Sequence, residues 1–247
     1  MTATPAPAHA TAAPHAPEPQ RSQLPPFRTR VLPVVALARA DAAVRLAHAL
    51  LEGGIDAIEI TLRTPAALAA IETLARQVPE LVVGAGTVLR PADLAAVRDA
   101  GARFALAPGC TPALLAAAAV MRLPFIPGVA SASEAMLAHE AGFGLLKCFP
   151  AIPLGGVELL KAWAGPLPEL RFCPTGGIGL EQLGAFLSLP NVALVGGSWI
   201  TPAAALDLGD WARITTLARQ ACAVAAAAAA PLRSEERRVG KECRSRW

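Results

Sequence analysis

The chain has little charge, no long apolar run and no closely spaced cysteines. Charged residues make up 17% of its 247 residues and the formal net charge is only +3, so nothing indicates a surface for nucleic acid or for an acidic partner. No uninterrupted apolar stretch approaches the roughly 18 to 20 residues that span a bilayer, so we expect a soluble protein without a membrane partner. These absences favour a small-molecule substrate.

Disulfide and metal chemistry also lack their usual patterns. The five cysteines are odd in number and include no C-x-x-C pair, which argues against a disulfide framework or a zinc site and fits a reducing cytoplasm. Two of the four histidines, His9 and His15, lie near the N-terminus, and the other two, His48 and His139, fall in expected helices without ligand spacing. We therefore expect no metal and no cofactor.

The two ends of the chain differ in composition from the part between them. Residues 1–26 are rich in Ala and Pro and have no continuous apolar segment, so we interpret them as a disordered extension and not as a secretory signal. Residues 232–247 follow an Ala-rich segment and are abruptly rich in Arg and Glu, which suggests a tail that is not native to the protein; a genuine basic tail is the alternative. One domain is expected between them, over residues 27–231.

Short β-rich runs alternate with longer helical ones through residues 31–220. This alternation predicts parallel βα units, and eight such runs predict a single-domain α/β protein with a closed (β/α)8 TIM barrel. An open doubly wound sheet shares the alternation, but no G-x-G-x-x-G follows the first run. The expected strands are residues 31–37, 57–63, 81–88, 104–108, 125–129, 144–149, 171–175 and 192–196.

Several expected helices carry recognisable first residues. Thr64 and Thr111 each precede a proline, an arrangement in which the threonine serves as the N-cap and the proline occupies the first helical position. Ser131 and Glu134 have the spacing of a capping box. These pairs predict helices that begin immediately after residues 64, 111 and 131.

Lys147 is the most unusual residue of the sequence. It alone among three lysines lies in an apolar, strand-like run, residues 144–150, whereas almost all other positive charge is arginine. A primary amine can form a Schiff base with a carbonyl group and a guanidinium cannot, so this placement suggests an amine nucleophile. A strand-end lysine that reaches solvent is the alternative interpretation.

Polar residues at the ends of two expected strands extend this site. Glu59, Thr61 and Arg63 alternate along one run, so we expect all three on one face, toward the barrel interior. A Glu–Arg pair that only satisfies itself is the alternative, but buried ion pairs are seldom retained for stability alone. Thr87 follows a glycine-containing turn at the end of the next run and offers a hydroxyl at the same rim.

Two glycine pairs follow the seventh and eighth expected strands. Exposed backbone N–H groups at such turns bind phosphate, and barrels most often hold phosphate at these two loops. Tight turns without a ligand are the alternative. The residues are Thr175, Gly176 and Gly177 in one loop and Gly196, Gly197 and Ser198 in the other.

Together these residues predict an acidic carbonyl substrate that carries a phosphate. Lys147 would attack the ketone to form a carbinolamine and then an iminium, which accepts electrons when a carbon–carbon bond breaks. Glu59 would transfer protons, and Arg63 would hold the substrate carboxylate through two parallel hydrogen bonds.

Several strings of the sequence resemble the 2-keto-3-deoxy-6-phosphogluconate (KDPG) aldolase family. The likeness spans residues 31–221, and its strings are residues 59–64, 83–89, 147–151, 171–178 and 196–199. The resemblance implies a metal-independent class I aldolase, commonly a homotrimeric barrel, that splits KDPG into pyruvate and D-glyceraldehyde 3-phosphate in the Entner–Doudoroff pathway. Many members also cleave 4-hydroxy-2-oxoglutarate, to pyruvate and glyoxylate.

The resemblance also implies a role for individual residues. Lys147 is matched to the Schiff-base lysine, Glu59 to the general acid/base, and Arg63 with Thr87 to the site for the pyruvyl carboxylate. The substrate-binding set is completed by Thr175, Gly176, Gly177, Gly197 and Ser198. The chain departs from the family pattern at Cys148, Ile152 and Gly179, where an aromatic, an acidic residue and a serine are usual.

Two other functions are open at this point. The phosphogalactonate aldolase branch uses the same lysine chemistry on the C4 epimer, but it typically carries Pro and Asn where this chain has Thr61 and Arg63. A catalytically silent phosphate-binding barrel is the alternative from a different class of protein, and the intact lysine, glutamate and arginine argue against it.

Overall fold

The computed structural model describes residues 24–229 of the chain. Within this range there are nine short strands, each followed by a helix except β5, and every strand pairing is parallel. The strands are β1 (Val31–Val35), β2 (Ala57–Thr61), β3 (Val82–Gly86), β4 (Phe104–Leu106), β5 (Phe125–Ile126), β6 (Gly128–Val129), β7 (Leu145–Cys148), β8 (Arg171–Phe172) and β9 (Val195–Gly197).

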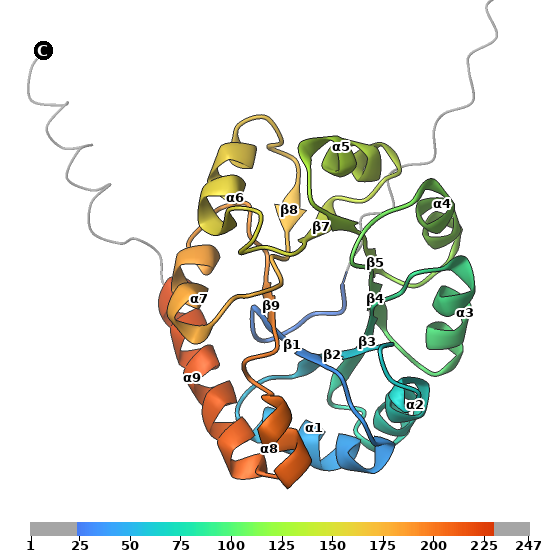
Figure 1. Cartoon of the computed structure of the whole chain (residues 1–247), viewed down its shortest axis with the longest axis vertical. Coiled ribbons are helices and arrows are strands. Elements are labelled where there is room, and N and C mark those ends of the chain that lie inside the picture. The colour runs from blue at the N-terminus through green and yellow to red at the C-terminus, as the bar shows by residue number, and fades with distance from the viewer. Residues whose placement is uncertain (1–23, 230–247) are drawn as a thin grey trace, which may run out of the picture.

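The helices form a ring around these strands (Figure 1). They begin with a short 3-10 helix, η1 (Ala40–Ala42). The α-helices are α1 (Ala43–Glu52), α2 (Ala67–Gln77), α3 (Pro91–Asp99), α4 (Pro112–Val120), α5 (Ala132–Glu140), α6 (Gly156–Ala164), α7 (Leu180–Leu187), α8 (Ala203–Leu208) and α9 (Trp211–Ala229).

The strands form two parallel sheets. One has the order β5-β4-β3-β2-β1-β9 and the other the order β6-β7-β8. Isolated bridges between Phe172 and Val192 and between Thr175 and Gly196 join the chain around β8 to the chain around β9. The structure is therefore an α/β fold with a curled array of parallel strands inside a ring of helices.

Every expected strand overlaps an observed one, with one division. The fifth expected run is split at Pro127 into β5, which pairs with β4, and β6, which pairs with β7. Proline has no N–H group to give to a strand ladder, so a break at this position has a direct cause. The two sheets separate at this break.

The predicted helix starts are right at two of three positions. Thr111 accepts a hydrogen bond from the backbone N–H of Leu114, and Ser131 forms a capping box with Glu134. The prediction at Thr64 is wrong, because α2 begins only at Ala67. The Thr64 hydroxyl instead donates a 2.6 Å hydrogen bond to the carbonyl oxygen of Leu37, which ties two loops together.

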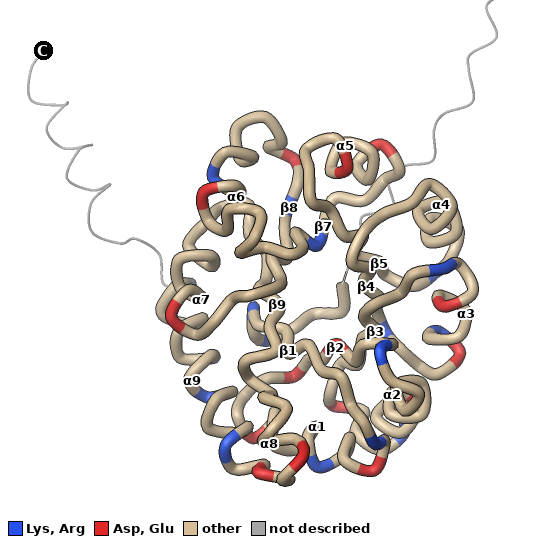
Figure 2. Tube along the Cα trace, in the orientation of Figure 1, with Lys and Arg blue, Asp and Glu red and all other residues tan. Residues whose placement is uncertain are grey.

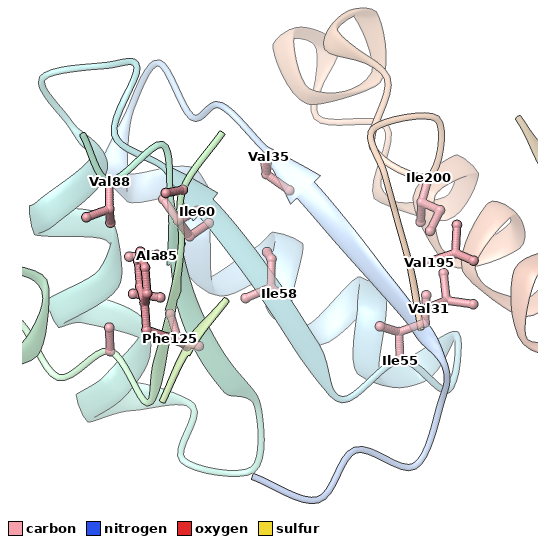
Figure 3. Close-up of a cluster of buried hydrophobic side chains, with 14 of the residues drawn as sticks. Val31, Val35, Ile55, Ile58, Ile60, Ala85, Val88, Phe125, Val195 and Ile200 are labelled. Carbon is pink, nitrogen blue, oxygen red and sulfur yellow. The ribbon is translucent and has the colours of Figure 1, made fainter. Parts of the chain in front are cut away.

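The larger hydrophobic cluster lies between the strands and the helices. Alternate strand residues such as Val31, Val35, Ile58 and Ile60 contribute to it, as Figure 3 shows, and buried helix residues such as Leu46 complete it. The outward face of each strand is therefore apolar. The opposite face is left for the interior of the strand array.

A smaller hydrophobic cluster fills the interior near the N-terminal ends of the strands. Its buried members come from several strands and include Leu32, Phe104 and Cys173. Leu24 and Phe27 pack against it, and the rings of Phe27 and Phe104 lie 5.4 Å apart. The segment before β1 therefore covers this end of the strand array.

Charge lies mainly at the outside of the molecule. Figure 2 shows that most Lys, Arg, Asp and Glu residues lie on the helices and loops, and few lie on the strands. None of the helices within residues 24–229 combines the length and the apolar character needed to cross a bilayer. The expected extension and tail, residues 1–26 and 232–247, lie outside the described residues except for residues 24–26.

Candidate active site

Lys147 on β7 and Glu59 on β2 form an ion pair between the two sheets. The Lys147 Nζ lies 2.8 Å from Glu59 Oε1, and the two side chains are 5% and 0% exposed. Lys147 is therefore buried, and the alternative of a strand-end lysine that reaches solvent is wrong. Glu59 Oε2 is also buried and has no hydrogen-bond partner among the described residues. An amine and a carboxylate oxygen with spare acceptor capacity therefore lie side by side.

Strand alternation explains why these two charges meet in the interior. Leu146 and Cys148, on either side of Lys147, belong to the outer hydrophobic cluster, so Lys147 points the opposite way. Ile58 and Ile60 have the same relation to Glu59. The apolar packing of their neighbours directs both charged side chains inward.

The structure corrects the prediction for Arg63. Strand β2 ends at Thr61, so Arg63 lies in the turn after the strand, where it is exposed, and not on the strand itself. The alternative of a Glu59–Arg63 pair is also wrong, because Glu59 pairs with Lys147. Arg63 makes no ion pair with any described residue, and its Nε lies 3.4 Å from the Thr87 hydroxyl. The guanidinium and this hydroxyl are thus adjacent at the rim.

Two hydroxyl groups near this rim have different partners. Thr61 is buried and its hydroxyl donates a 3.0 Å hydrogen bond to the carbonyl oxygen of Val35, so it is not available to a ligand carboxylate. Thr87 is partly exposed and has a positive φ of 59°, an uncommon conformation for a residue other than glycine. Strained backbone of this kind is found most often at functional sites.

The two glycine loops lie next to each other. The bridge between Thr175 and Gly196 joins them, and Thr175 as a whole residue is 4% exposed. A Cβ atom on Gly196 would lie 2.4 Å from the Thr175 hydroxyl oxygen, so the absence of that atom makes room for the threonine.

The outer part of these loops is open and leads into a helix. Gly176 and Gly177 have φ values of 107° and 79°, and α7 begins three residues after Gly177, at Leu180. Gly177 and Ser198 are exposed, whereas Gly197 is buried. The structure thus places the two predicted loops side by side, and the loop that contains Gly176 and Gly177 leads into the start of α7, an arrangement suited to an anion.

Sequence reasoning did not identify the residues that pack around the lysine. The Phe149 ring centroid lies 5.6 Å from Lys147 Nζ. The spacing in the sequence could have indicated Phe149, because residues two apart lie on the same face of a strand and residues 147 and 149 share a face if the strand continues. Cys173 lies near the ion pair, and burial raises the pKa of its thiol to about 12 although the Lys147 charge lowers it. The thiol is therefore neutral at physiological pH.

Among residues 24–229, no three His, Cys, Asp or Glu side chains are grouped so that they could hold a metal ion. The functional groups that the structure gathers at this site are the amine of Lys147, the carboxylate of Glu59, the guanidinium of Arg63, the hydroxyls of Thr87 and Ser198, and the two glycine loops.

Comparison with known proteins gives consistent matches over this range. A protein-family model described as KDPG and KHG aldolase matches residues 27–217. The chain is 50% identical over 192 residues to 2-dehydro-3-deoxy-phosphogluconate aldolase of Pseudomonas aeruginosa, covering 78% of this chain and 87% of that protein. It is 49% identical over 191 residues to KHG/KDPG aldolase of Escherichia coli, and the match covers 77% of this chain and 90% of that protein.

Solved structures match in the same way. A KDPG aldolase from Legionella pneumophila, with pyruvate captured as a covalent carbinolamine intermediate, has a TM-score of 0.77 and 45% identity over 78% of this chain and 94% of that one. A structure described as native KDPGal has a TM-score of 0.73 and 25% identity, and the match covers 81% of this chain and 96% of that one.

Proposed function

Because the chain belongs to the KDPG and KHG aldolase family, we propose that it cleaves KDPG to pyruvate and D-glyceraldehyde 3-phosphate as a class I aldolase of the Entner–Doudoroff pathway. We propose 4-hydroxy-2-oxoglutarate, cleaved to pyruvate and glyoxylate, as a second substrate, in line with the name of the Escherichia coli relative. One observation supports the chemistry most strongly: the amine of Lys147 lies buried, 2.8 Å from a carboxylate oxygen.

The proposed reaction begins with an attack by the Lys147 amine on the keto carbon. The new C–N bond gives a carbinolamine, and loss of water gives an iminium. Breaking the C3–C4 bond sends its electron pair toward the iminium, which becomes an enamine, while the C4 hydroxyl loses its proton and becomes the aldehyde. We assign these proton transfers to Glu59, whose Oε1 already accepts a hydrogen bond from Lys147 and whose Oε2 has no partner within residues 24–229.

We assign the substrate carboxylate to Arg63 and Thr87. The guanidinium is free of carboxylate partners within the described part of the chain and lies 3.4 Å from the hydroxyl, so the two can act on one ligand group. A guanidinium binds a carboxylate through two parallel hydrogen bonds, which would fix the orientation of the keto acid.

We assign the substrate phosphate to the two glycine loops. The proposed ligands are the backbone of Gly176, Gly177 and Gly197 and the hydroxyl of Ser198, with Thr175 lining the path from the amine. Exposure of Gly177 and Ser198 and the start of α7 nearby support this assignment, because helix N-termini attract anions.

We propose that the two sheets together form one closed (β/α)8 barrel in a single domain over residues 27–231. The bridges around β8 and β9 support closure. We also propose a homotrimer, for which sedimentation equilibrium should give three times the chain mass of 25.3 kDa, and a monomer mass would contradict it. The four free cysteines of the described range fit a cytoplasmic location.

Borohydride trapping with pyruvate tests the mechanism. Hydride reduces an iminium to a stable secondary amine, so intact mass and peptide mapping should find a pyruvate-derived adduct on Lys147 and none on Lys161, which is exposed and paired with Glu158. Lys147→Arg keeps the positive charge but cannot form the iminium, and it should abolish the adduct and turnover. A folded wild-type protein that gives no adduct would contradict the proposal and favour a silent phosphate-binding barrel.

Substrate choice is tested by assaying KDPG beside its C4 epimer. The higher identity to KDPG aldolases, 50% against 25% for the KDPGal structure, leads us to expect a larger kcat/KM for KDPG. A larger kcat/KM for the epimer would reassign the substrate while leaving the lysine chemistry in place.

A further inference from the structure

We infer that Gly86 is a positioning residue for the proton-transfer group, because the absence of a side chain there creates the space in which the Glu59 carboxylate reaches Lys147. The inference rests on the proposed function, since it concerns the carboxylate to which we assign the proton transfers.

The geometry at Gly86 carries this inference. Gly86 is the last residue of β3 and pairs with Thr61 on β2. A Cβ atom on Gly86 would lie 2.0 Å from Glu59 Oε1, 2.6 Å from its Cδ and 2.7 Å from its Cγ. All three distances are shorter than any contact between non-bonded atoms allows, so a side chain here and the observed position of the carboxylate exclude each other.

The oxygen that would be displaced is the one that contacts the amine. Glu59 Oε1 accepts the 2.8 Å hydrogen bond from Lys147 Nζ. The backbone of Gly86 does not have a positive φ, so its conformation would tolerate an ordinary side chain. Space for the carboxylate, and not backbone conformation, is therefore what the glycine provides.

The neighbouring glycine of β3 shows that equivalent space is not available farther back along the strand. Glu59 itself pairs with Gly84, but the ring of Phe104 fills the space above Gly84, where a Cβ atom would lie 2.2 Å from two ring carbons. The Glu59 side chain instead extends along the strand direction to lie against Gly86. The two glycines thus lie on the same strand and each is in close contact with a side chain, but Gly84 contacts the Phe104 ring and Gly86 contacts the Glu59 carboxylate.

The predicted consequence is specific to proton transfer. With pyruvate bound as the iminium, a base takes a C3 proton, the C3–H electrons form the C2–C3 double bond, and the C=N π electrons move to nitrogen. In D2O the reverse step places deuterium on C3, so loss of the pyruvate methyl signal in the NMR spectrum measures this transfer. Gly86→Ala should slow the exchange by about 100-fold, because a displacement of roughly 1 Å can have that effect.

Gly84→Ala is the matched control. Its added methyl group meets Phe104 and not Glu59, so it should lower the melting temperature while the exchange rate per folded molecule stays close to wild type. Gly144→Ala, where a Cβ atom would meet no atom within 4 Å, should change neither quantity.

A double-mutant cycle with Glu59→Ala separates positioning from general damage. Glu59→Ala removes the three atoms that would lie nearest to a Cβ atom on Gly86. Gly86→Ala should therefore lower the melting temperature in the wild-type background but not further in the Glu59→Ala background, whereas the effect of Gly84→Ala should be the same in both. Equal effects of Gly86→Ala in the two backgrounds would overturn the inference.

The outcomes distinguish this inference from the proposed function. If the wild-type protein gives neither a borohydride adduct on Lys147 nor methyl exchange, the proposed function fails. If the wild type shows both and Gly86→Ala exchanges at the wild-type rate, the proposed function stands and the role of Gly86 is refuted.

Discussion

At the scale of single residues, removing one partner of the buried ion pair should cost more stability than removing an exposed lysine. Lys147→Met leaves the fully buried Glu59 carboxylate without its cation, so the free energy of unfolding should fall by about 3–5 kcal/mol. Lys161→Met, at a side chain that is 55% exposed, should change it by less than about 1 kcal/mol. Urea unfolding monitored by circular dichroism measures both values.

A double variant that removes both charges separates the effect of the unpaired carboxylate from that of lost packing. Lys147→Met with Glu59→Leu replaces both charges by apolar groups of similar length, which should restore most of the lost stability while the protein stays inactive. A double variant as unstable as Lys147→Met alone would show that lost packing, and not the unpaired carboxylate, causes the loss.

At the scale of elements, the capping box of α5 gives a test of how the helices begin. Ser131 Oγ accepts a 3.3 Å hydrogen bond from the Glu134 N–H, and the Glu134 carboxylate accepts one of 3.1 Å from the Ser131 N–H. Ser131→Ala should lower the free energy of unfolding by about 1 kcal/mol. Ser133→Ala in the same helix removes an exposed hydroxyl without these bonds and should leave stability unchanged or slightly higher. Equal losses in both variants would contradict the capping role.

The sequence allowed the positions of the strands to be predicted better than their ends. Apolar β-rich runs between helical segments mark all the strands, because each must bury one face against a helix. The end of β2 at Thr61 and the break at Pro127 depend on which neighbour each strand pairs with, and a single run carries no such information. The prediction that the strand extends to Arg63 was therefore wrong, because Arg63 lies in the following turn.

The same limit applies to the candidate site. Lys147 could be singled out because a lysine in an apolar run is rare. Glu59 could be placed at the same site from the strand pattern, but its ion pair with Lys147 could not be predicted, since the two residues lie 88 positions apart and belong to different sheets. The glycines before Thr87 were noted in the sequence only as part of a turn, and the role of Gly86 is visible only when the side chain of a neighbouring strand is placed against it.

At the scale of the whole molecule, stability should decline at alkaline pH because of two buried thiols. Burial raises the pKa of Cys148 and of Cys173 to about 12, from an ordinary value of 9.0. Above pH 9 the unfolded chain loses protons that the folded chain retains until about pH 12, so unfolding is favoured as pH rises. Each thiol should reduce the free energy of unfolding by about 1.4 kcal/mol per pH unit in this window.

The composition makes this effect measurable. The chain has no tyrosine and only three lysines, so few other side chains titrate in the same window. Urea unfolding between pH 8 and 11 should show a shallower decline for the Cys148→Ala/Cys173→Ala variant than for wild type. Identical slopes would mean that the two thiols do not retain their protons in the folded state.

The ion pair between the sheets also has a consequence for how such a protein changes over generations. In a homologue that is no longer selected for activity, a substitution of Lys147 alone would still be unfavourable. It would leave the buried carboxylate of Glu59 unpaired and lower the free energy of unfolding. Drift away from catalysis should therefore replace both residues together, and lineages that retain one without the other should be rare. Substitutions at positions 59 and 147 should therefore be correlated in evolution, although the two positions lie 88 residues apart along the chain.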